Sequence, residues 1–220
     1  MYTIHLVLFE RLFMLSIAFV LFSFITLGIL LASGALSGLP IRAGYIGAVI
    51  LVVIAFLARR HWRKRARVAG DDPSTAERRA WLYMAGTAMI CAYVIVVLAT
   101  PGTEVHRVNG GTGGFDSWIM LAGASIAWGL LYERAAVKDE RDRAIDGHAI
   151  RVGYTAIVVL LIVFLLALGF APRPTMQRFT HWLIANSLLT VIMLSALAHY
   201  VAQLVYYQRD RLELLAASKC

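Results

Sequence analysis

Charged residues are scarce in this chain. Asp, Glu, Lys and Arg make up only 15% of its 220 residues, while 60% are hydrophobic. A soluble domain carries about 25% charged residues on average, so this chain lacks the polar coat that a water-facing surface needs. The shortage excludes a soluble globular domain and predicts that lipid faces most of the outer surface.

Cysteine is nearly absent. Cys91 lies inside an apolar run and Cys220 is the last residue, and the two share no motif spacing. We therefore expect neither a disulfide nor a cysteine metal site. Acidic residues are also few, which leaves a net charge of +8. The excess Lys and Arg residues lie in short connections between apolar runs, so they are a topology signal rather than a nucleic-acid surface.

Six long apolar runs are present instead. A bilayer core about 30 Å thick requires roughly 20 apolar residues as an α-helix. The runs that meet or approach this length are residues 12–33, 43–58, 80–99, 117–135, 152–171 and 182–207. They predict an all-α, polytopic transmembrane bundle of six spans in three hairpins, with residues 1–220 forming one integral membrane domain.

The basic residues are unevenly divided between the two sides of this bundle. Of the 21 Lys and Arg residues, the predicted topology places four on one side, namely Arg42, Arg107, Arg173 and Arg178. The other 17 share the opposite side, which the positive-inside rule assigns to the cytoplasm. We expect a multi-pass protein of the bacterial inner membrane with both termini in the cytoplasm.

A mixed-charge stretch separates the fourth and fifth runs. At its centre are Asp139, Glu140, Arg141 and Asp142, and Asp146 and Gly147 follow. We expect the fourth span to continue out of the membrane as a charged helix that stops at Gly147. The aspartates could hold Mg²⁺, but the interleaved cations favour ion pairs within the helix, so no metal site is predicted.

This stretch resembles a widespread family of small prokaryotic membrane proteins. The resemblance rests on Asp139–Asp142, Ile145 and the Gly153-Tyr154 pair that opens the next span, and it covers spans three to six. It implies a regulatory or stress-response role beside small helix-turn-helix repressors. It brings no catalytic residue.

A basic cluster follows the second run. Its members are Arg59, Arg60, Arg63, Lys64 and Arg65. Their first role is to fix topology. We also expect contact with anionic lipid, worth about 1 kcal/mol per basic residue near the surface. No nucleic-acid partner is predicted, because no folded reader accompanies the cluster.

Polar residues inside the last run are the intramembrane candidates. Ser195, His199 and Gln203 are spaced four apart and share one helix face, while Asn186 and Thr190 share another. In lipid such groups need partners. We expect His199 to bond a Ser, Thr or Tyr hydroxyl on another helix, and a proton relay or a ligand site is the alternative. No second histidine lies at matching depth, so haem is not expected, and no cofactor is predicted.

Small residues four apart predict the packing faces of the bundle. These pairs are Ala43/Gly47, Gly44/Ala48, Ala88/Ala92 and Gly123/Ala127. The run 152–171 has almost no small or polar face, so we expect it to lie against lipid or another subunit.

The function that fits these features is a non-catalytic membrane protein, an accessory or regulatory component acting through helix packing and its charged cytoplasmic helix. Its expected partner is another membrane or cytoplasmic protein. The alternative is a small transporter or channel that uses polar groups on spans one, three and six. An enzyme ranks last, because catalysis needs convergent His, Asp or Glu groups and here they are scattered.

Overall fold

The computed structural model of the chain describes residues 2–33, 40–66, 74–100, 114–130, 139–172, 176 and 179–217, without the side chains of residues 2–12, 63, 65, 66, 114, 215 and 216. The regular structure within these ranges is all helical, which confirms the predicted class. The helices are α1 (Tyr2–Ala32), α2 (Ala43–Ala66), α3 (Thr75–Ala99), α4 (Gly114–Leu130), α5 (Glu140–Phe170) and α7 (His181–Ala217).

Five of these helices are long and apolar enough to cross a membrane. Their candidate spans are Phe13–Ala32, Ala43–Trp62, Thr75–Ala99, Glu140–Phe170 and His181–Leu214. The remaining helix, α4, is 17 residues long over Gly114–Leu130. All six overlap the predicted runs, and the count of six spans stays a prediction.

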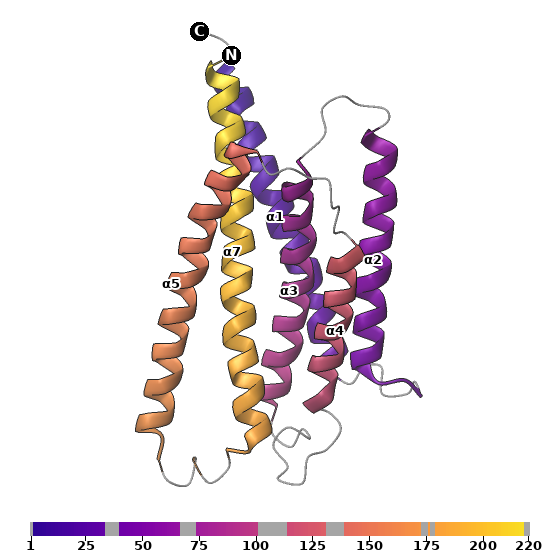
Figure 1. Cartoon of the computed structure of the whole chain (residues 1–220), viewed down its shortest axis with the longest axis vertical. Coiled ribbons are helices and arrows are strands. Elements are labelled where there is room, and N and C mark those ends of the chain that lie inside the picture. The colour runs from indigo at the N-terminus through magenta and orange to yellow at the C-terminus, as the bar shows by residue number, and fades with distance from the viewer. Residues whose placement is uncertain are drawn as a thin grey trace.

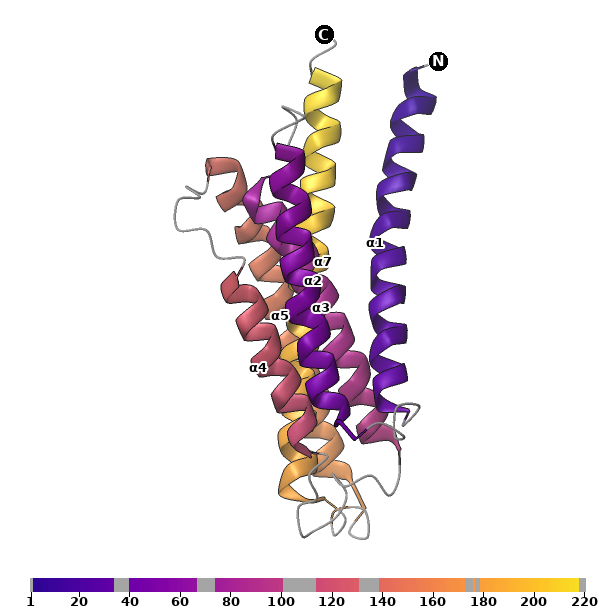
Figure 2. The ribbon, with the colours of Figure 1, turned by 90° about the vertical axis from the view of Figure 1, so that its right-hand side faces the viewer.

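The helices run roughly parallel to one long axis (Figure 1). α1 and α7 pack against α3, α2 packs against α4, and α5 packs against α7. α3 is the most buried of the candidate spans, and Met84, Met89 and Ile90 of this helix are completely inaccessible. Seen from the side, α1 and α4 lie on opposite flanks of the bundle (Figure 2). α3 is therefore the central helix that contacts α1, α7 and α4, while α2 and α5 join the bundle through α4 and α7.

One end of the bundle collects the basic helix ends. The start of α1, the ends of α2 and α7, and the starts of α3 and α5 all lie there (Figure 1). We call it the basic end, because α2 brings Arg59, Arg60 and Lys64 to it and α3 brings Arg78 and Arg79. Arg42 lies at the opposite end, whereas Arg107, Arg173 and Arg178, the other basic residues expected there, lie outside the described residues.

Small residues allow the close helix contacts. A Cβ atom added at Gly123 of α4 would lie 2.5 Å from the Cβ of Ala48 on α2, closer than carbon atoms approach. Gly47 likewise faces Met120 of α4. The predicted small faces of α2 and α4 therefore pack against each other. Gly28 of α1, which the sequence did not single out, makes a similar contact with α3 at Met89.

One side of the apolar stretch of α5 packs against α7, and the rest of its surface is uncovered. None of its most apolar window is buried, and side chains such as Tyr154, Leu165 and Phe170 are largely exposed. Soluble monomers rarely expose continuous apolar surface on this scale. The observation agrees with the prediction that this helix faces lipid or another subunit.

The predicted helix boundary in the charged stretch is wrong. α5 begins directly after Asp139 and runs without a break through Gly147, so Glu140, Arg141 and Asp142 form the first turn of α5 rather than an extension of α4. Asp139 is the N-cap, and its Oδ1 accepts a hydrogen bond of 2.7 Å from the backbone N–H of Glu140. An N-cap followed by acidic residues stabilises a helix start, and this start outweighs the helix-breaking tendency of Gly147.

Candidate functional site

A buried carboxylate joins three helices at the basic end. Asp142 of α5 is 9% exposed, and its Oδ1 accepts a 2.7 Å hydrogen bond from Tyr207 Oη of α7. The same oxygen accepts a 3.2 Å bond from Ser74 Oγ, whose hydroxyl also caps α3 by accepting from the backbone N–H of Glu77. Asp142 therefore fixes the start of α5 to the end of α7 and the start of α3.

Two ion pairs flank this carboxylate. Glu77 of α3 is only 3% exposed, and its Oε2 lies 2.6 Å from Arg211 Nη2 of α7. Arg141 of α5 pairs with Asp210 of α7, and its guanidinium carbon lies 6.0 Å from the centre of the Tyr207 ring. These contacts are charge-assisted and partly shielded from solvent, which makes them stronger than surface pairs.

We call this set the three-helix polar cluster. Its members are Ser74, Glu77, Arg141, Asp142, Tyr207, Asp210 and Arg211. The pairing differs from the expected one, because Arg141 and Asp142 bond to other helices rather than along their own. Removing the partner of such a partly buried carboxylate lowers the stability of the fold by several kcal/mol, because the charge is left buried and unpaired. The cluster therefore clamps α3, α5 and α7 together.

The predicted intramembrane face continues this contact between α5 and α7. His199 Nε2 lies 3.8 Å from Asp146 Oδ1, one turn beyond Asp142 on α5. A Cβ atom at Gly153 would lie 3.0 Å from the Cβ of His199 and 3.4 Å from the backbone oxygen of Ser195. The face that carries Ser195, His199 and Gln203 is thus the face that meets α5. The expected hydrogen bond from His199 to a hydroxyl stays a prediction; the structure places the Asp146 carboxylate beside the imidazole, at a distance longer than a hydrogen bond.

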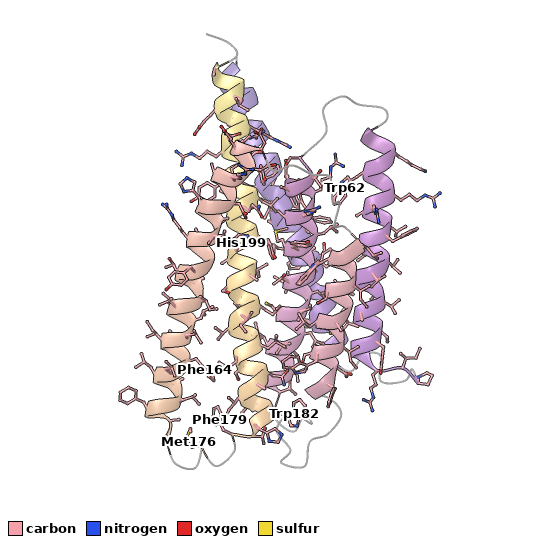
Figure 3. All side chains as sticks on the ribbon, viewed as in Figure 1. Trp62, Phe164, Met176, Phe179, Trp182 and His199 are labelled. Carbon is pink, nitrogen blue, oxygen red and sulfur yellow. The ribbon has the colours of Figure 1, made fainter. Side chains whose placement is uncertain are left out.

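A row of aromatic rings leads away from His199 across the bundle. Its ring lies edge-on to Tyr200 at 5.0 Å between centroids, and Tyr200 lies 5.2 Å from Tyr83 of α3. Tyr83 in turn lies 5.1 Å from Trp128 of α4. Edge-to-face and tilted pairs at these separations are favourable packing contacts. Figure 3 labels His199 between the basic end and the bundle's middle. These ring contacts pack α7, α3 and α4 against one another at this depth of the bundle.

The second predicted polar face of α7 meets α4. Asn186 is 2% exposed, and its Oδ1 accepts a 2.6 Å hydrogen bond from Ser117 Oγ of α4. Its Nδ2 donates to the backbone oxygen of Trp182, while Thr190 Oγ1 donates to the backbone oxygen of Asn186. The Ser117–Asn186 hydrogen bond joins α4 to α7, and the two bonds within α7 give the Asn186 amide and the Thr190 hydroxyl their partners.

The basic cluster forms the end of α2. Arg59 Nη1 donates a 2.8 Å hydrogen bond to the backbone oxygen of Leu130, the last residue of α4. Arg60 and Lys64 are exposed, while the side chains of Arg63 and Arg65 lie outside the described residues. Trp62 meets Arg78 of α3, whose guanidinium carbon lies 6.0 Å from the ring centre.

A small apolar crevice lies between helices, farther from the basic end than Arg59 and Trp62. Its lining comes from α1, α2, α3 and α4, and includes Leu51, Ala55, Leu82, Gly86 and Trp128. His199 is not among the lining residues. Within the described ranges, His, Cys, Asp and Glu form no group of three that could hold a metal ion.

The chain matches no protein-family model, no curated protein and no solved structure.

Proposed function

We propose that the chain is a non-catalytic module of the bacterial inner membrane that binds another protein, with both termini in the cytoplasm. Five helices suited to crossing a membrane and the gathering of Lys and Arg at one end support this placement, because cytoplasmic connections carry the excess of basic residues. The uncovered apolar face of α5 supports an intramembrane partner.

One observation carries the proposal: some charged side chains at the start of α5 face the other helices of the bundle, and others face solvent. Arg141 and Asp142 turn inward into the three-helix polar cluster, whereas Asp139, Glu140 and Arg143 remain exposed. The inward pair holds the helix end in place, so the outward charges are displayed on a rigid support. A rigid surface loses little conformational entropy when a partner binds.

The arrangement of titratable groups supports a non-catalytic role. Glu77 is engaged with Arg211, and Asp142 with Tyr207. At the basic end Glu77 joins α3 to α7, and Asp142 joins α5 to both α7 and the cap of α3. The resemblance of the segment 139–142 to membrane proteins that act beside small repressors points in the same direction, toward an accessory or regulatory component.

The transport alternative has less support. A transporter would need a polar cavity near mid-membrane with His199 on its wall. The crevice described above is lined by apolar side chains of α1–α4, while His199 packs against α5 and Tyr200. The accessory role is therefore preferred.

The test is whether a protein partner co-purifies through the exposed charges. The double variant Glu140→Lys with Arg143→Glu reverses both outward charges and leaves Arg141 and Asp142 intact. The matched control is Arg42→Glu, an exposed charge at the opposite end. After extraction in a gentle detergent, native mass measurement should show a protein complex for the wild type and the control, and its loss in the double variant. A wild type that carries no protein partner would overturn the proposal.

A further inference from the structure

α5 is held to the bundle mainly at its start. Its buried residues are Asp142, Ile145 and Ala149, all within the first three turns. Beyond Gly153 the side of α5 that faces α7 is only half-buried, and α5 leans away from α7 toward the opposite end of the bundle (Figure 1). We call residues 142–153 of α5, with His199 and Tyr207 of α7, the α5–α7 joint. Contacts within this joint set the angle at which the rest of α5 leaves the bundle.

A histidine and a carboxylate face each other inside the joint. His199 Nε2 lies 3.8 Å from Asp146 Oδ1, and the two side chains are only 19% and 23% exposed. Gly153 lets the backbone of α5 approach the His199 Cβ closely, since an added Cβ would lie 3.0 Å from it. Charge-assisted bonds between nitrogen and a carboxylate are about 2.7–2.9 Å long. A movement of about 1 Å would therefore turn this contact into an ion pair.

The charge of this contact depends on a proton. Histidine side chains change their charge between about pH 5 and 8, whereas carboxylates are ionised and phenols are neutral throughout that range. The other charged or titratable groups near His199 on the helices around it are Asp142 on α5, Tyr200 on α7, and Tyr83 and Arg79 on α3. Asp142 is already bonded to Tyr207 and Ser74. Asp146 is therefore the carboxylate that a protonated His199 would attract.

We propose that His199 and Asp146 form a proton-controlled latch in the α5–α7 joint. In mildly acidic solution the imidazolium is drawn to the carboxylate, and the start of α5 is held more tightly against α7. As the pH rises the imidazole loses its charge, the attraction is lost, and α5 is left to its other contacts. The latch would regulate the exposure of the α5 surface, but it requires no partner and goes beyond the binding role proposed above.

The test measures the distance between the outer parts of α5 and α7 by pulsed electron paramagnetic resonance. Spin labels are attached through Leu166→Cys on α5 and Leu188→Cys on α7, both exposed positions, in a background of Cys91→Ala and Cys220→Ala. The labelled protein is placed in lipid nanodiscs, where the same buffer reaches both faces. Between pH 8 and pH 5.5 the ratio of the two distance populations should change about tenfold, the effect of one charge-assisted bond.

Three variants assign the response to the latch. His199→Gln and Asp146→Asn should each abolish it, because either one removes a charge of the pair. The matched control is His148→Gln. His148 also titrates and lies on the same part of α5, but its side chain is exposed and its ring meets Tyr206 at 5.4 Å between centroids, so this variant should respond as the wild type does. A wild type without a pH response, a response that persists in His199→Gln or Asp146→Asn, or its loss in His148→Gln would each overturn the proposal. The protein is measured alone, so failure to find a binding partner would not affect this result.

Discussion

Removing Arg211 tests whether the three-helix polar cluster clamps the bundle. Its partner Glu77 has a side chain only 4% exposed, while that of Arg211 is 32% exposed. At an effective dielectric of about 20, opposite charges about 4 Å apart attract by about 4 kcal/mol. Because water reaches Arg211, we discount this value. Arg211→Met should lower the free energy of unfolding by about 2–4 kcal/mol, since it leaves a buried carboxylate without its cation.

The assay is reversible unfolding of the purified protein in mixed micelles of mild detergent and dodecyl sulfate, followed by circular dichroism. The control is Arg209→Met, two residues away on α7. Arg209 pairs with Glu213 at 3.3 Å, but the side chains are 75% and 68% exposed. An exposed pair at this spacing contributes about 0.5 kcal/mol or less, so the control should unfold nearly as the wild type does.

A double variant separates the ion pair from the packing of the long Arg211 side chain. Glu77→Gln combined with Arg211→Met removes both charges, so no buried carboxylate is left unpaired. It should be more stable than Arg211→Met alone, because uncharged pairs tolerate burial. The reasoning fails if Arg211→Met and Arg209→Met cost the same, or if the effects of the two substitutions in the double variant simply add.

Two further predictions use the same unfolding assay. Tyr207→Phe removes the 2.7 Å hydrogen bond to the Asp142 carboxylate and should cost about 1.5–3 kcal/mol; an unchanged stability would show that Asp142 does not need this donor. Gly123→Ala places a Cβ atom 2.5 Å from that of Ala48 and should cost about 1–3 kcal/mol. Gly129→Ala on the same helix, with open space around its Cβ, should be neutral or stabilising, and equal effects at the two glycines would contradict the close α2–α4 contact.

The apolar runs were predictable because hydropathy is a local property. The last run was expected at 182–207 and is found within α7, His181–Ala217. The extra turns of α7 are charged, so they carry no hydropathy signal. The same limitation misassigned the segment 139–147, although a usable signal was present there: Asp139 followed by Glu140 and Asp142 is the pattern of a helix start rather than a helix end.

The residue pairs in the candidate site could not be predicted from the spacing of residues in the sequence. Asp142 and Tyr207 are 65 residues apart in sequence, and Glu77 and Arg211 are 134 apart. Periodicity reports which residues share a face of one helix, and it says nothing about which helix that face will meet. The face of Ser195, His199 and Gln203 was identified correctly, but its neighbour α5, with Asp146 opposite His199, emerges only from the packing of the bundle.

The first turns of α3 contact two neighbouring helices. Glu77 belongs to the three-helix polar cluster, and Arg78, the next residue, lies against Trp62 of α2. Successive helical residues point about 100° apart, so one short stretch of backbone makes both contacts. The hydrogen bond from the Glu77 backbone N–H to Ser74, itself bonded to Asp142, fixes this stretch to α5. A protein that displaced the start of α5 would therefore strain the cap of α3 and shift Arg78 against Trp62. The cap of α3 therefore links the position of the α5 start to the contact between α3 and α2.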